Sequence, residues 1–322
     1  WKISRAGGEP EPFFNLHVPI DFYSISRETN DLAFIPKLDD TLIEVISNGV
    51  ETGNQQDIVR CQLNSSRVEF GPRFSRDGLK LVFTSNRTGW DEIWTANADC
   101  TESRQLTNFK AYGAGSPRWS PDGSRIVFDR RVDGRPEIFT INSDGSGLRQ
   151  MTNTVGSTRP FWAPDGQSIY FTLYTPGATY QEQVWNLNVA SGEMTQVTMN
   201  GGIEPVVSPD GKRLYYTKDY YLYQKDLPAG METPVPGMEK IQLDRYWDVA
   251  TSSIFYVPFH HGEEPAIYRF DLQNGKTTLV RRLDKKPMAG QIGLSISSDE
   301  KLMAVCLINQ HMGDILMIRN WK

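Results

Sequence analysis

Six residues stand at fixed distances before a recurring turn, and their side chains could bind an anion. Arg73, Arg118 and Tyr246 precede the turn position by two residues, while Arg159, Glu204 and Asp244 precede it by four. A guanidinium group is planar and takes a carboxylate through two parallel hydrogen bonds. If the turns are equivalent, the six residues surround one opening, with the arginines on one side and the acids and Tyr246 on the other. We predict a binding site for an anionic group there; the alternative is that these charges pair with each other in a structural ring.

The stretch that most resembles a metal site is His260-His261-Gly262-Glu263-Glu264. Adjacent residues of a strand point to opposite faces, so both histidines could share one ion only in an irregular loop. The only other histidines are His17 and His311, so a site with three ligands would need carboxylates. We predict an exposed hairpin tip, without a metal ion or a cofactor.

Nucleophilic catalysis by serine needs a strained G-x-S-x-G turn together with a histidine and an acid. The sequence contains no G-x-S-x-G. We therefore assign no catalytic residue and favour a non-catalytic protein.

The turns belong to a repeated unit of four short β-type segments, which is clearest between Ser116 and Thr152. Ser120-Pro121-Asp122-Gly123 combines a fixed φ at proline, an aspartate that bonds to the backbone beyond it, and a glycine that relieves strain. β-Branched and aromatic residues follow in Arg125–Phe128 and Glu137–Ile141, and Asn142–Gly145 forms another turn. We predict that each unit is a meander of four antiparallel strands.

Copies of the unit repeat with a period of roughly 40–50 residues, which is typical of a β-propeller. We predict an all-β fold, a propeller of four-stranded antiparallel blades, with seven blades as the favoured number and six as the alternative. Residues 1–322 would form this single domain. Because the chain begins inside a repeat, we expect Pro12–Leu16 to be the N-terminal strand that completes the last blade and closes the ring. The turn positions are Ser26, Ser75, Ser120, Ala163, Ser208, Asp248 and Ser297, and the turns at Ser26, Asp248 and Ser297 are degenerate.

The two faces of the predicted disc differ in composition. Turns from the first to the second strand, and from the third to the fourth, lie on one face and have uniform sequences. The other face carries hairpins and inter-blade loops that vary in length and are rich in aromatic and charged residues, such as Asn86–Trp90, Tyr174–Tyr180 and Asp219–Tyr221. This composition is typical of a recognition surface, so we expect the ligand on the loop-rich face.

The segment Ser120–Thr152 and its copies resemble the TolB-like, WD-type β-propellers of bacteria over nearly the whole chain. The C-terminal third, with Glu232–Gly237, Tyr246-Trp247 and the ending Gly313–Trp321, also resembles the propellers at the C-terminus of bacterial winged-helix transcriptional regulators. The second resemblance implies that the propeller is the sensor or scaffold part of a larger regulator. This chain contains no winged helix, so DNA binding would belong to another part.

Composition restricts the possible partners. A net charge of −5 and a pI near 5.5 argue against nucleic acid, which requires a concentrated basic face. No apolar run approaches the roughly 18 residues of a membrane span. Cys61, Cys100 and Cys306 are too few and too scattered to indicate a disulfide framework.

These observations lead us to predict a monomeric binding propeller that takes a protein, a peptide or a small anionic ligand on its loop-rich face. We expect neither membrane insertion nor nucleic-acid binding by this chain, and an extracytoplasmic location is favoured over a cytoplasmic one. The alternative function is a propeller enzyme with its site at the channel mouth, such as a lyase or a hydrolase-associated propeller.

Overall fold

The computed structural model describes residues 20–25, 32–36, 38–47, 59–65, 67–111, 113–154, 156–177, 182–259, 264–312 and 316–318. The chain divides into two compact units. The smaller, from residues 1–40 and 309–322, contains an antiparallel sheet in which β2 (Leu32–Pro36) lies between β1 (Ile20–Ile25) and β27 (Leu316–Ile318). The larger, residues 41–308, is built from six four-stranded antiparallel sheets, the blades of a propeller.

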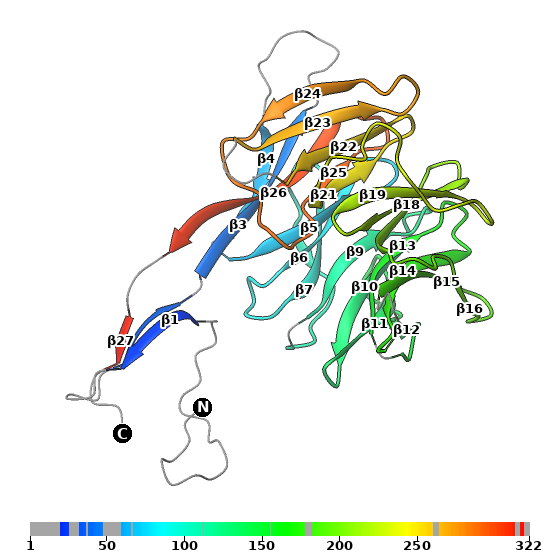
Figure 1. Cartoon of the computed structure of the whole chain (residues 1–322). Helices are drawn as coiled ribbons and strands as arrows, with labels where there is room; N and C mark the ends of the chain where they lie inside the picture. The colour runs from blue at the N-terminus through cyan, green and yellow to red at the C-terminus, as the bar shows by residue number, and fades with distance from the viewer. Residues whose placement is uncertain are drawn as a thin grey trace. The chain divides into compact units, whose positions relative to one another are not determined.

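Five blades follow one another along the chain, and in each the four strands are hydrogen-bonded in sequence order (Figure 1). Blade 1 comprises β5 (Glu69–Phe74), β6 (Lys80–Ser85), β7 (Glu92–Asn97) and β8 (Arg104–Gln105); blade 2 comprises β9 (Gly115–Trp119), β10 (Arg125–Val132), β11 (Arg135–Asn142) and β12 (Arg149–Gln150); blade 3 comprises β13 (Ser157–Trp162), β14 (Ser168–Tyr174), β15 (Glu182–Asn188) and β16 (Met194–Gln196). Blade 4 comprises β17 (Ile203–Val207), β18 (Arg213–Lys218), β19 (Tyr221–Asp226) and β20 (Thr233–Pro234); blade 5 comprises β21 (Leu243–Val249), β22 (Ser253–Pro258), β23 (Ala266–Asp271) and β24 (Thr277–Arg282).

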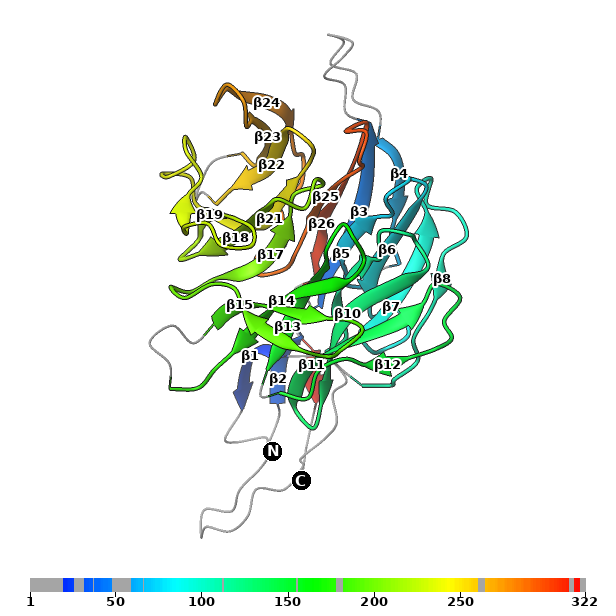
Figure 2. The same ribbon diagram turned by 90° about the vertical axis from the view of Figure 1, so that its right-hand side faces the viewer.

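Blade 6 combines two distant parts of the chain. Its strand order is β25 (Leu294–Ile296), β26 (Leu302–Met312), β3 (Leu38–Ser47) and β4 (Val59–Leu63), and Figure 2 shows β3 and β4 beside β26. The prediction of seven blades is therefore wrong, because strands that we assigned to a first and a last blade share one sheet. The prediction that one N-terminal strand completes the last blade is wrong as well, because β3 and β4 both do so. Pro12–Leu16 lies outside the described residues.

The innermost strands form a closed ring around the propeller axis. Each of β5, β9, β13, β17, β21 and β25 contacts the next, and β25 contacts β5. At this last junction the Gly71 amide donates to the Ile292 carbonyl at 2.9 Å, and the Phe74 amide donates to Ser295 Oγ at 3.2 Å. Closure leaves no innermost strand at a free edge.

Two polar motifs explain why the repeat sequences recur. In the first-to-second turn, the Ser120 hydroxyl donates to Asp122 at 2.5 Å, and the same bond recurs in the turns that begin at Ser75, Ser208 and Ser297. The turn aspartates therefore serve to cap the turns.

The second motif joins the third strand of a blade to a threonine that lies just after the fourth strand. In blade 1, Thr107 Oγ1 donates to the buried Glu92 carboxylate at 2.6 Å and accepts from the Ile93 amide at 2.9 Å. Thr152 with Glu137, and Thr198 with Gln183, repeat it.

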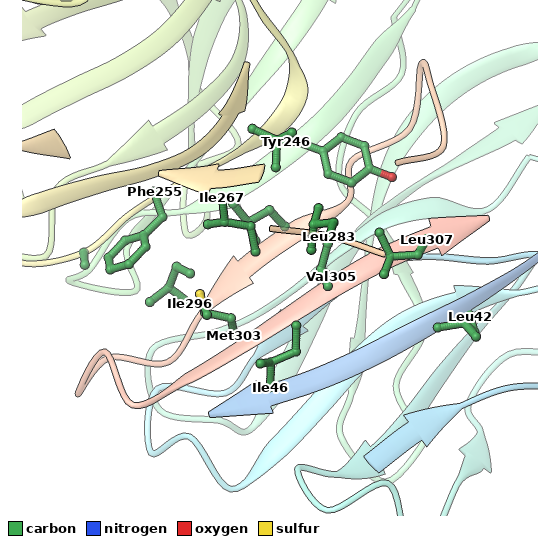
Figure 3. Close-up of a cluster of buried hydrophobic side chains, with 13 residues drawn as sticks. Leu42, Ile46, Tyr246, Phe255, Ile267, Leu283, Ile296, Met303, Val305 and Leu307 are labelled. Carbon is green, nitrogen blue, oxygen red and sulfur yellow. The ribbon is translucent and has the colours of Figure 1, made fainter. Parts of the chain in front are cut away.

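Apolar side chains fill the spaces between blades. Between blades 5 and 6, Phe255 and Ile267 pack with Ile46 and Val305 (Figure 3), and none of the four has measurable exposure. Burial of such a side chain stabilises the fold by about 1.5–3 kcal/mol. All elements within the described ranges are strands, as expected for an all-β protein. These ranges include no helix of the length and apolar character needed to cross a membrane.

A disulfide joins blade 6 to blade 1. Cys61 in β4 is bonded to Cys100 in the turn between β7 and β8, with the Cα atoms 5.8 Å apart. Cys306 is free and buried. The three cysteines form no framework but do form this one disulfide, which the sequence did not indicate because its cysteines are 39 positions apart and meet only when the ring closes.

Candidate functional site

The mouth of the central channel on one face is a pocket of about 330 Å³. We call this face the turn side, because the turns from the first to the second strand of all six blades reach the pocket wall. The pocket, termed the turn-side pocket, is lined by residues that include Arg73, Ser75, Arg118, Ser120, Phe161, Pro164, Pro209, Asp248, Thr251, Ser295 and Ser297.

Two arginines of neighbouring blades lie in its wall. Arg73 is only 5 % exposed; it donates to the carbonyl oxygens of Pro72 and Leu294, and its Nε is buried without a hydrogen bond. The Arg118 guanidinium lies 4.8 Å from the centre of the Phe161 ring. Within the described part of the chain, no hydrogen bond or ion pair engages that guanidinium. Cation–π contact stabilises its charge but leaves its in-plane N–H donors available.

The electrostatic environment of these arginines is unfavourable to their charges. Burial, and then the positive charge of Arg73, lower the pKa of Arg118 to about 9, although Asp248 and Glu204 oppose the shift. Burial likewise lowers the pKa of Arg73. Because both shifts signal a charge that lacks full compensation, an anion that entered the pocket would be stabilised by both guanidinium groups.

Asp248 supplies the acidic group of the same pocket. Its Oδ2 accepts from the Ile296 amide of blade 6 at 3.1 Å, and its Oδ1 accepts from the Val249 amide at 3.0 Å. Both carboxylate oxygens are thus held by backbone donors, and Asp248 does not form an ion pair with either pocket arginine.

The sequence analysis placed Asp248 in a turn, and the structure corrects this alignment. Val249 pairs with Ile254 as Trp119 pairs with Ile126, so Asp248 is equivalent to Arg118. The turn of blade 5, closed by the Ala250 amide and the Ser253 carbonyl, holds two residues, where the turn of blade 2 that is closed by Ser120 and Arg125 holds four. The turn position of blade 5 was located from its second strand on the assumption of a four-residue turn, and the predicted positions in β21 were therefore wrong.

A second layer of charges lies nearer the opposite, loop-rich face. Glu204 is 5 % exposed, with Oε1 at 3.0 Å from Arg245 Nε and 3.6 Å from Arg159 Nε. Arg159 also lies 3.3 Å from the exposed Glu182. Burial raises the pKa of Glu204, while Arg159 and Arg245 act in the opposite direction.

Backbone geometry positions this layer. Arg159, Glu204 and Arg245 have φ angles of 54°, 57° and 57°, and each lies at a register irregularity of its innermost strand. A left-handed residue in a strand creates a bulge that turns its side chain out of the regular alternation. The sequence analysis identified Arg159 and Glu204 and missed Arg245, because the misaligned turn of blade 5 pointed to its neighbour Asp244.

The last two predicted site residues lie elsewhere. Asp244 Oδ2 accepts from the Gly290 amide at 3.0 Å. Tyr246 is 2 % exposed in the core between blades 5 and 6 (Figure 3), where its hydroxyl donates to the Cys306 carbonyl at 2.9 Å and accepts from the Met288 amide at 2.8 Å. Both border a separate cavity of about 660 Å³ on the loop-rich face. Neither reaches the turn-side pocket.

The histidine cluster falls largely on residues 260–263, which lie outside the described ranges. Across the ranges that are described, histidine, cysteine, aspartate and glutamate side chains form no group of three or more that could hold a metal ion.

Comparison with known proteins places the chain in a family. Residues 52–233, more than half of the chain, match the model of the TolB beta propeller domain. No curated protein is similar enough in sequence to count as a relative.

Solved structures share the fold at low sequence identity. A putative TolB from Agrobacterium tumefaciens has a TM-score of 0.68 and 17 % identity, with 84 % of this chain and 99 % of that chain covered. TolB from Acinetobacter baumannii has a TM-score of 0.59 and 17 % identity, with coverage of 89 % and 68 %. A chain of a nidogen/laminin complex has a TM-score of 0.57 and 11 % identity, with coverage of 84 % and 99 %. On the family match over residues 52–233, this chain belongs to the TolB beta propeller domain family.

Proposed function

We propose that this propeller is a non-catalytic binding module that takes a carboxylate group of a protein or peptide partner into the turn-side pocket. The observation that carries the proposal is the Arg118 guanidinium, which borders the pocket with no acceptor among the described residues. Arg73, on the adjacent blade, contributes a second positive charge at the same wall. Two guanidinium groups match the geometry and the charge of a carboxylate.

The two layers of charge have different roles in this proposal. Arg159 and Arg245 form ion pairs with Glu204 and serve the structure, whereas Arg73 and Arg118 have no ion-pair partner within the described residues and serve the ligand. The proposal thus moves the ligand from the loop-rich face, where the sequence analysis expected it, to the turn side. Membership of the TolB beta propeller family and the likeness to a chain of a nidogen/laminin complex support a role in protein interaction.

The Cys61–Cys100 disulfide supports an extracytoplasmic location, because such bonds persist in oxidising compartments. The resemblance of the C-terminal third to propellers of winged-helix regulators is compatible with a role as the sensor part of a larger protein.

Calorimetric titration with glutarate and with its neutral diamide tests the proposal. Glutarate should bind and the diamide should not. Arg118→Gln should weaken glutarate binding by about 10- to 100-fold, the value of one charge-assisted hydrogen-bond pair. Arg149→Gln removes the same charge from an exposed site in blade 2 and should leave binding unchanged. Equal binding of glutarate by both variants would refute the proposed site.

A further inference from the structure

The rim of the turn-side pocket is interrupted between blades 4 and 5. At two other junctions neighbouring turns approach each other. Ser298 Oγ of blade 6 donates to the Arg76 carbonyl of blade 1 at 2.6 Å. A Cβ atom at Gly166 of blade 3 would lie 3.9 Å from the Pro121 ring of blade 2. Blade 5 instead carries the short turn between Ala250 and Ser253, with two residues where the turn of blade 2 has four.

A groove of about 600 Å³ occupies this interruption. All its lining residues belong to turn-side segments of blades 4 and 5 or to the strand ends that flank them. Pro209 and Thr251 line both the groove and the turn-side pocket, so the two depressions adjoin. Together they provide a path from the channel mouth to the outer edge of the propeller.

The groove offers hydrogen-bonding groups beside apolar surface. Within the described part of the chain, the side chains of Lys212, Ser252 and Gln273 have no hydrogen bond or ion pair, while Leu227 and Leu272 add apolar contact. Unengaged polar side chains beside apolar ones suit an extended main chain, which presents an N–H and a C=O at every residue.

We propose that the groove holds the main chain of an extended peptide segment of a partner protein, whose terminal carboxylate sits against Arg73 and Arg118. This inference rests on the proposed function and specifies its ligand. Each extended residue adds roughly 3.3–3.6 Å, so residues before the carboxylate soon reach beyond the pocket and into the groove. The shortened turn of blade 5 thereby determines the direction in which the bound segment leaves the channel.

Peptides of two lengths test the inference. Acetyl-Gly-Ser and acetyl-Gly-Ser-Gly-Ser-Gly-Ser, each as free acid and as C-terminal amide, are titrated by calorimetry into the full chain. The longer acid should bind about tenfold tighter than the shorter one, because its additional residues contact the groove. Ser252→Trp should abolish this gain and leave the affinity of the short acid unchanged. Gln167→Trp, which adds the same bulk to an exposed position of the blade 3 turn, should preserve the gain.

The outcomes separate the two proposals. If both acids bind equally and Arg118→Gln weakens both, the groove inference fails and the proposed function stands. If no acid binds, both fail. A long amide that ends in glutamate identifies the source of the carboxylate: binding equal to that of the free acid assigns it to a side chain. If Ser252→Trp lowers the melting temperature, Gln273→Trp on the blade 5 wall provides the same obstruction. If the longer acid still binds more tightly than the shorter one to that variant, the inference is overturned.

Discussion

Arg245 Nε lies 3.0 Å from Glu204 Oε1, so an ion pair between a partly exposed guanidinium and a buried carboxylate joins blades 5 and 4 beside the channel. Glu204→Gln would leave Arg245 and Arg159 near each other without their shared carboxylate. Both arginines are partly exposed, at 29 % and 17 %, so the loss of the shared carboxylate should cost about 1–3 kcal/mol of unfolding free energy, measurable by urea denaturation. Glu182→Gln removes the partner of Arg159 that is 45 % exposed and should cost about 0–1 kcal/mol. Similar losses in both variants would show that the buried carboxylate has no special weight.

The disulfide between blades 6 and 1 should stabilise the closed ring. Cys61→Ser should lower the free energy of unfolding by about 2–4 kcal/mol, since the bond restricts the unfolded chain. Dithiothreitol should bring the wild type to the same value and leave the variant unchanged. Cys306 should stay unreactive toward thiol reagents in the folded protein, because burial raises its pKa to about 12. No effect of the reductant on wild-type melting would contradict the prediction.

The turn aspartates should make stability depend on pH at the acid end. Hydrogen bonds from the Ser120 hydroxyl and then from the Ser124 hydroxyl lower the pKa of Asp122 from 3.8 to about 2. Because the folded-state pKa is below the unfolded value, the contribution is complete above pH 3.8 and is lost as the pH falls through about 2. Asp122→Asn should therefore melt below the wild type at pH 6, and the two curves should converge near pH 2. A constant difference over this range would exclude the carboxylate as the cause.

The threonine that follows the fourth strand can be tested with a matched pair. Thr152→Val leaves the buried Glu137 carboxylate without its 2.6 Å donor, while Thr198→Val leaves the neutral Gln183 amide without its 2.8 Å donor. Glu137 keeps its donors from Thr154, and Gln183 keeps its donor from the Gly201 amide, so each variant removes one hydrogen bond from that group and does not leave it unsatisfied. The lost bond is worth about 1.5–3 kcal/mol when it is made to the charged carboxylate and about 0.5–1.5 kcal/mol when it is made to the neutral amide. Thermal melting should thus show the larger loss for Thr152→Val, and the reverse order would indicate that the hydroxyl acts mainly on the backbone.

Local chemistry made the repeat unit predictable. The turn Ser120–Gly123, the strand Arg125–Phe128 and Thr152 each form contacts with residues nearby in the sequence, and the four-stranded antiparallel blade follows from them. The family resemblance rested on the same residues. The number of blades was not predictable in this way, because no local signal shows that Leu38–Ser47 pairs with Leu302–Met312.

The candidate site, too, was predictable only where the blades follow the regular repeat. Arg73, Arg118, Arg159 and Glu204 precede turns of regular length, and their offsets from those turns placed them around the channel. Blade 5 departs from the repeat in both the length of its turn and the position of its bulge, and so Asp244 and Tyr246 were named where the structure has Arg245 and Asp248. The offsets also could not reveal that the pocket with Arg73 and Arg118 is lined by the uniform turns rather than by the varied loops.

The composition of blade 6 has a consequence for the order in which the chain can fold. In blades 1–5 every strand pairs with a neighbour from the same continuous segment, so all pairing partners of a blade are present once that segment has been made. The hairpin of β3 and β4 is synthesised before all of them, yet its partner β26 is synthesised after them. During that interval β3 presents an unpaired edge, the kind of surface at which chains associate wrongly. In the finished ring β26 covers this edge.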